Sequence, residues 1–173
     1  MAKKKTLSVK RMALYGFLIA LGFVLGYVES LVPIYLGAPG VKLGLANLAA
    51  VIALYSLGVK AAAFINIARI LLVGFTFGNM ASILFGLTGA AFSLFVMAVC
   101  RKCHFFSMVG VSVLGGVCHN IGQFLIAAYV VKTFGVFSYL PVLLIAGTIA
   151  GALIGLLGGL VLERIRGAID VHD

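Results

Sequence analysis

The chemistry available to this sequence lies in a few polar side chains within an almost continuous apolar chain. The segment "GGVCHNIGQF" (115–124) places His119, Asn120 and Gln123 between the apolar stretches "MVGVSVL" and "LIAAYVV". His119 and Gln123 stand at positions i and i+4, so they share one face of a helix. Polar groups are costly in such a setting. They are expected either to hydrogen-bond between helices or to line a binding site.

A second polar pair lies within the apolar stretch 61–78, where Asn66 and Arg69 share a helix face at i and i+3. An arginine at the centre of a membrane helix costs about 2.5–3.5 kcal/mol and is expected to face a cavity or a partner. The candidates for that partner are Glu29 and a bound anion. For Asn66, Asn79 and Asn120, a hydrogen bond to a neighbouring helix is the alternative to a ligand contact.

The elements that position these residues are predicted to be membrane helices. The 173 residues are 64% hydrophobic and only 10% charged, whereas soluble domains are usually about a quarter charged. This composition indicates an all-α integral membrane protein, a compact bundle of six transmembrane helices. Apolar runs bounded by charges, Pro or Gly place the spans at roughly 12–32, 43–58, 61–78, 80–100, 107–131 and 139–162.

These spans predict one transmembrane domain, 12–163, between a basic N-terminus, 1–11, and a C-terminal tail, 164–173. The apolar run from Met12 is too long for a secretory signal and no small-residue cleavage site follows it, so we expect a retained first helix. The 22 glycines fit the same picture, because small residues let membrane helices approach closely.

The basic residues predict the orientation. With both termini in the cytoplasm, ten lysines and arginines lie on the inner side of the membrane and two, Lys42 and Lys132, on the outer side. The net charge of +9 lies mainly at the ends of apolar segments. It is therefore a topology signal, and no nucleic-acid partner is expected. The inner set is Lys3, Lys4, Lys5, Lys10, Arg11, Lys60, Arg101, Lys102, Arg164 and Arg166.

Most of the polar groups are expected between the midplane and the outer surface. At about 1.5 Å per helical residue across a core of about 30 Å, Arg69 lies near the midplane and His119 and Gln123 lie farther out. The sequence therefore predicts an outward-facing pocket with Arg69 at its floor and the 119–123 segment as one wall. The other residues expected to line it are Asn47, Glu29, Lys42, Asn79, Asn120 and Asn66.

The sequence supports neither a bound cofactor nor an enzyme active site. "CRKCH" (100–104) matches a haem-attachment pattern, but the predicted topology puts it in the cytoplasm, and Cys100, Cys103 and His104 give zinc only three ligands. We expect no cofactor and no metal. The chain has four carboxylates, too few for aspartate-rich magnesium–diphosphate sites, and no nucleotide-binding loop. We therefore expect a protein that is not an enzyme.

Pairs of small residues four apart make close helix contacts in membranes. The first span has Gly16 and Ala20 followed by Gly22 and Gly26, and the sixth has "GTIAG" and "GALIG". These pairs either pack the bundle internally or dock a partner membrane subunit.

Four segments, "YVESLVP", "GVKLGLANLAAVIALYSLG", "RILLVGFTFGNMAS" and "GVSVLGGVCHNIGQFLIAA", resemble the bacterial Gx transporter family, also called heptaprenyl diphosphate synthase component I. The resemblance covers residues from about 12 to 162. That family is similar in size and topology to the S components of energy-coupling-factor (ECF) importers. The resemblance implies a six-helix protein that holds a small molecule in an outward-facing pocket.

From this resemblance we expect a membrane-embedded, S-component-like transport protein that captures a small anionic or polar-headed molecule. Its implied partners are a membrane coupling subunit and a pair of ATPases, docked in part through Gly16 and Ala20, although S components carry Ala-x-x-x-Ala there. The alternative is a non-catalytic membrane subunit of a heptaprenyl diphosphate synthase, with a prenyl synthase as partner, or of a quinone- or flavin-linked redox system.

Overall fold

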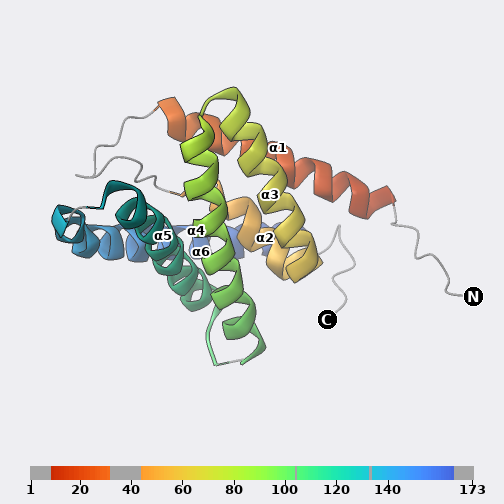
Figure 1. Ribbon diagram of the computed structural model, residues 1–173. Helices are drawn as coiled ribbons and strands as arrows, with labels where there is room; N and C mark the ends of the chain where they lie inside the picture. Colours follow the sequence, from red (N-terminus) through yellow and green to blue (C-terminus); the bar gives the residue numbers. More distant parts are fainter. Residues whose placement is uncertain (1–8, 32–43, 104, 133, 166–173) are drawn as a thin grey trace, which may run out of the picture.

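The computed structural model describes residues 9–31, 44–103, 105–132 and 134–165, and within these ranges every regular element is a helix (Figure 1). The long helices are α1 (Val9–Leu31), α3 (Val59–Thr76), α4 (Met80–Lys102), α5 (Met108–Val131) and α6 (Leu140–Ile165). A short helix, α2 (Asn47–Leu57), lies between α1 and α3, and a 3₁₀ turn, η1 (Phe134–Tyr139), precedes α6. Five of these helices are long and apolar enough to cross a membrane. The expected all-α membrane bundle is confirmed, and the chain is a multi-pass membrane protein.

The helix α2 differs most from its predicted span, 43–58. Its 11 residues extend about 16 Å, roughly half the thickness of a hydrocarbon core. Gly44 adopts a left-handed backbone conformation with φ of +74°, which stops the helix from continuing toward its N-terminus. In addition, the Glu29 carboxylate of α1 accepts hydrogen bonds from the backbone N–H groups of Gly44 and Leu45. Both features fix the start of α2 at the level of Glu29.

The C-terminal end of α2 connects directly to α3 and also contacts α4. Gly58, with φ of +90°, separates α2 from α3. Arg101, near the end of α4, donates a hydrogen bond to the carbonyl of Leu54 and places its guanidinium 5.0 Å from the centre of the Tyr55 ring. The ends of α2 and α4 therefore lie at the same side of the bundle, where the predicted orientation places the cytoplasm.

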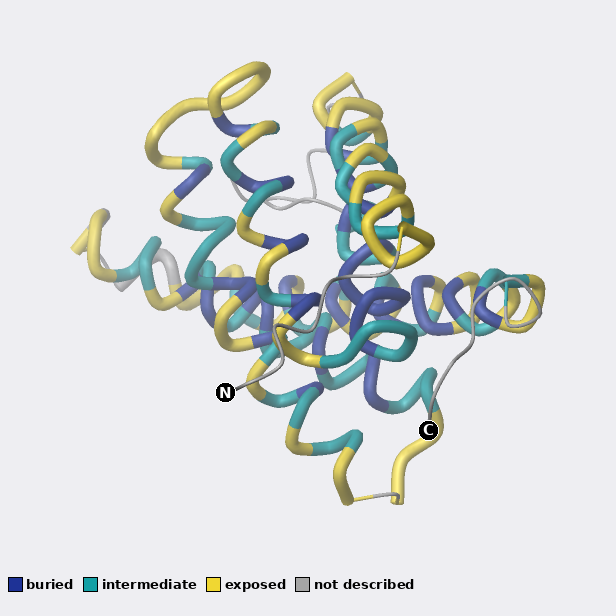
Figure 2. The backbone as a smooth tube through the Cα atoms, turned by 90° about the vertical axis from the view of Figure 1, so that its right-hand side faces the viewer, coloured by how far each residue is buried: buried dark blue, intermediate teal, exposed yellow. Residues whose placement is uncertain are grey.

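The core is built around α2. All six residues from Ala49 to Leu54 are buried, as expected for a helix that is apolar on every side. α2 packs on α1, α3 and α6. In addition, α3 packs on α1 and α4, α4 packs on α5, and α5 packs on α6. The long helices turn many large apolar side chains outward, among them Phe75 and Phe95, each 71% exposed. Burial is thus concentrated in the interior of the bundle and the apolar exterior is suited to lipid (Figure 2).

Glycines set the closest helix contacts. A Cβ atom at Gly151 of α6 would lie 2.6 Å from the Cα atom of Val113 in α5, and one at Gly116 would lie 2.4 Å from the carbonyl oxygen of Gly147. These glycines let the two backbones touch, and α5 and α6 form the most extensive helix pair of the bundle. The small residues of the sixth predicted span therefore pack the bundle internally.

Candidate functional site

The site is centred on Arg69, which lies in the middle of α3 and is 7% exposed. Its Nε donates a hydrogen bond of 2.6 Å to Oδ1 of Asn66, one turn earlier on the same helix. Its Nη2 donates a hydrogen bond of 2.7 Å to Oδ1 of Asn47, the first residue of α2. Among the described residues, Nη1 of Arg69 has no hydrogen-bond partner. The two asparagines thus fix the plane of the guanidinium, and the N–H groups of Nη1 can donate hydrogen bonds to a ligand.

Gly22 of α1 provides the space for this arrangement. A Cβ atom at Gly22 would lie 2.8 Å from Cδ of Arg69. Gly26, one turn later, faces Val73 of α3 in the same way, with its Cβ position 2.7 Å from Cγ2. Of the two small-residue pairs in the first span, Gly22 and Gly26 therefore pack α1 against α3.

Glu29 is the acidic group of the site. Besides holding the start of α2, its carboxylate interacts electrostatically with Arg69. Arg69 was expected to pair with Glu29 or with a bound anion. Its hydrogen-bond partners among the described residues are two neutral amides, and the bound anion stays a prediction. Because both hydrogen-bond partners are neutral, the hydrogen bonds themselves do not neutralise the positive charge of the guanidinium.

His119 of α5 lies on the opposite wall and is 9% exposed. Its Nδ1 is buried and has no hydrogen-bond partner among the described residues. Gly89 of α4 lies against the imidazole, since a Cβ atom there would be 2.9 Å from Cε1 of His119 and 3.0 Å from Cγ of Gln123. A glycine at this point allows both polar side chains of α5 to fit beside α4.

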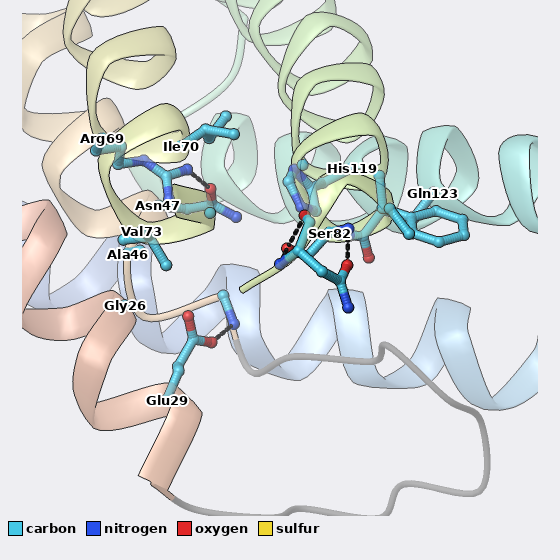
Figure 3. A pocket seen from close by; sticks show the side chains of 16 residues that line it. Gly26, Glu29, Ala46, Asn47, Arg69, Ile70, Val73, Ser82, His119 and Gln123 are labelled. Atoms are coloured by element: carbon cyan, nitrogen blue, oxygen red, sulfur yellow. Dashed lines mark hydrogen bonds between the residues drawn. The ribbon is translucent and has the colours of Figure 1, made fainter. Parts of the chain in front are cut away.

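These groups surround a cavity of about 270 Å³ (Figure 3). Figure 3 shows Arg69 and Asn47 on one side, His119, Ser82 and Gln123 on the other, and Glu29 apart from both, on α1. Apolar side chains complete the wall, including Ile70, Val73 and Phe85. A small site with one charged anchor, several amides and an apolar remainder is typical of pockets that bind small molecules.

The structure brings six of the nine predicted binding residues to this cavity, namely Glu29, Asn47, Arg69, Asn79, His119 and Gln123. Asn66 lies behind Arg69 and holds it. Asn120 turns toward α6, where its Nδ2 donates a hydrogen bond of 2.7 Å to the carbonyl oxygen of Leu143. Lys42 lies outside the described residues.

Asn79 and Ser82 also have a local role. They form a reciprocal capping box at the start of α4, in which Asn79 Oδ1 accepts from the Ser82 N–H and Ser82 Oγ accepts from the Asn79 N–H. The predicted docking residues Gly16 and Ala20 are exposed on α1, and nothing lies within 4 Å of a Cβ atom built at Gly16. Sequence reasoning missed the apolar wall and the glycines that face Arg69 and His119. Apolar and glycine positions are too common in this chain to single out those few.

Within the described residues, no group of three or more His, Cys, Asp and Glu side chains could hold a metal ion. Cys100 and Cys103 are free cysteines near the end of α4, and His104 lies outside the described part of the chain. The expectation of no haem at these residues stays a prediction.

Fold and site together define a multi-pass helical membrane protein with a cavity between its helices that polar and apolar side chains line. The family model of heptaprenyl diphosphate synthase component I matches residues 18–161. The chain therefore belongs to this family, and the resemblance inferred from its sequence segments is confirmed. Component I is the non-catalytic component of the synthase, which supports the expectation that this chain is not itself catalytic. Neither the comparison with curated proteins nor that with solved structures gave a match.

Proposed function

We propose that this protein is the membrane-embedded, non-catalytic subunit of a heptaprenyl diphosphate synthase, and that its cavity binds the anionic head group of a small molecule or lipid. Membership of the component I family carries the first part of the proposal. The arrangement of Arg69 carries the second. A guanidinium held by two neutral amides beside a cavity presents both positive charge and free N–H donors to an anion.

The family description suggests a polyprenyl diphosphate as the first candidate for the ligand. Such a molecule has a compact, highly charged head and a long apolar tail. Arginine binds phosphate groups well because its planar fork matches their oxygens. The tail would lie among apolar surfaces, which the bundle offers in its exterior and in cavity residues such as Ile70 and Phe85.

In this role the subunit would hold substrate or product at the membrane while a separate chain performs the chemistry. The shortage of carboxylates supports this division. Among the described residues, Glu29 and Glu163 are the two acids, and Glu29 already accepts the N–H groups at the start of α2. An aspartate-rich magnesium site must then belong to a partner, for which a prenyl synthase is the candidate.

The second candidate function is substrate capture for import, as in the S components of ECF transporters. The cavity itself favours it, because α1, α3, α4, α5 and the start of α2 all contribute lining residues. Gly16 and Ala20, exposed on α1, would then meet a coupling subunit.

Gentle purification of the tagged protein from its own membranes tests these functions. We expect a prenyl synthase chain to co-purify, and native mass spectrometry to show an anionic isoprenoid bound to wild type and absent from Arg69→Gln. Lys102→Gln, which removes the same charge from an exposed position, is the matched control. Co-purification of ATPase chains and a coupling subunit would replace the synthase proposal with the transport proposal. A ligand retained by Arg69→Gln would contradict the anion site in either case.

A further inference from the structure

A second, much smaller cavity lies on the inner side of His119, between α2, α4, α5 and α6. Its volume is about 20 Å³, and it shares Gly44, Asn47 and His119 with the main cavity. Ser93 of α4 and Ser112 of α5 line this cavity. Both serines are buried, at 4% and 3% exposure. The small cavity therefore extends the polar interior from the Arg69 region toward the inner half of the bundle.

The polar groups around this cavity have unused hydrogen-bonding capacity. His119 is nine-tenths buried, and its Nδ1 has no partner among the described residues. Asn47 uses Oδ1 to hold Arg69, so its Nδ2 remains as a donor. Within the same part of the chain, the Ser93 hydroxyl makes no hydrogen bond either. Buried polar groups of this kind are normally satisfied, often by an ordered water molecule.

We propose that the small cavity is a binding site for a single water molecule that donates a hydrogen bond to Nδ1 of His119. A volume of about 20 Å³ holds one water, since one needs at least about 10–15 Å³. The water accepts a hydrogen bond from Asn47 Nδ2 and exchanges another with Ser93 Oγ. Three partners are the usual number for a buried water.

A metal cation fits this cavity poorly. Arg69 and His119 line the same main cavity, and Asn47, which accepts a hydrogen bond from Arg69, lines both cavities. A second positive charge in so confined a space would be repelled by the guanidinium. In addition, the polar groups of the described lining residues are neutral hydroxyls, amides and an imidazole, with no carboxylate among them.

The bound water has a consequence for the main cavity. It connects His119 to Asn47 and, through Asn47, to Arg69, so that both walls of the main cavity belong to one hydrogen-bonded network. Accepting at Nδ1 also places the imidazole proton on Nε2, because a neutral imidazole donates from only one nitrogen. His119 then has a fixed ring orientation and a fixed tautomer. The water site is independent of which ligand the main cavity binds and of the proposed function.

Solid-state NMR of the full chain in lipid bilayers tests the proposal. The histidine is labelled with ¹⁵N, and the changes His104→Gln and His172→Gln leave His119 as the one histidine. We expect an unprotonated Nδ1 shifted by hydrogen bonding, a protonated Nε2, and magnetisation transfer from bound water to the ring. Ser93→Ala should weaken the transfer. Ser56→Ala, whose hydroxyl bonds within its own helix to Ile52, should not.

The His119 signal of the protein with only His104→Gln and His172→Gln is sufficient to decide between the outcomes, so a Ser93→Ala variant that fails to fold does not leave the question open. A ring without water transfer, or a protonated Nδ1, would overturn the proposal. A spectrum that changes when sodium replaces potassium in the buffer would assign the cavity to a cation and overturn it as well. Ligand binding in the main cavity can persist in all of these outcomes, so the two proposals fail separately.

Discussion

Arg69 in the middle of α3 donates a hydrogen bond from Nη2 to Oδ1 of Asn47, the residue at which α2 begins. This bond joins residues 22 positions apart in the chain and places a helix start beside a buried cation. The N-terminus of a helix carries a partial positive charge. The start of α2 and the guanidinium therefore favour negative charge at the same place, and Glu29 supplies part of it. A bound anion would supply the rest.

The first prediction concerns the hydrogen bond that holds Nε of Arg69. Asn66→Leu removes its acceptor and leaves a buried charged donor without a partner, so we expect a loss of about 1–3 kcal/mol in the free energy of unfolding. Asn66→Asp keeps an acceptor at the same position and should retain the fold. Because its carboxylate cancels the guanidinium charge, it should also weaken anion binding. Thermal unfolding in detergent measures the difference, and equal stability of wild type and Asn66→Leu would contradict the role given to Asn66.

The second prediction concerns Glu29. Its replacement by Gln retains an oxygen that can accept from the Gly44 and Leu45 N–H groups but removes the negative charge near Arg69. We therefore expect inorganic diphosphate to bind roughly tenfold more tightly, which corresponds to about 1.4 kcal/mol. Glu163→Gln, the same change at an exposed position of α6, should leave the affinity unchanged. Weaker binding by Glu29→Gln, measured by isothermal titration calorimetry, would show that Glu29 supports the ligand and does not compete with it.

The third prediction tests the contact between α5 and α6. Gly151→Ala would push a methyl group against the Val113 Cα atom, 2.6 Å away, and backbone cannot rotate aside as a side chain can. We expect the free energy of unfolding of Gly151→Ala to fall by about 1–3 kcal/mol. Gly159→Ala, two turns farther along the same helix, has nothing within 4 Å of the new methyl group and serves as the control. A similar unfolding temperature for both variants would argue against this helix contact.

The fourth prediction tests the orientation in the membrane. Cys103 is exposed at the end of α4, beside the basic residues that are expected in the cytoplasm. In a Cys100→Ser, Cys118→Ser background, a membrane-impermeant maleimide should label Cys103 in inside-out vesicles and not in right-side-out vesicles. Labelling from the outer side would reverse the predicted topology and the outward direction of the cavity.

The long helices could be predicted from the sequence because their signal is local. The predicted spans change at Gly58 and begin at residues 80 and 107, and in the structure Gly58 separates α2 from α3 while Asn79 and Ser107 cap the starts of α4 and α5. The start of α2 could not be predicted in this way. It depends on the Glu29 carboxylate, which reaches Gly44 from another helix 15 residues earlier, and on the positive φ of Gly44.

The candidate site was predictable in part for the same reason. Helical spacing places His119 with Gln123 and Asn66 with Arg69, and each pair does share a face. The pairing of Arg69 with Asn47 depends on how α2 packs against α3, which no local pattern encodes. Asn120 resembles its neighbour His119 in the sequence, yet a rotation of about 100° along the helix turns it to Leu143 of α6.

The most direct test of the central claim compares heptaprenyl diphosphate with heptaprenol as ligands of the purified protein in lipid nanodiscs. The two molecules share a tail and differ in the anionic head. We expect the diphosphate to bind wild type at least about tenfold more tightly than the alcohol does, a difference of about 1.4 kcal/mol. Arg69→Gln should abolish that difference. Equal binding of both ligands to wild type, or an unchanged preference in Arg69→Gln, would contradict an anion site at Arg69.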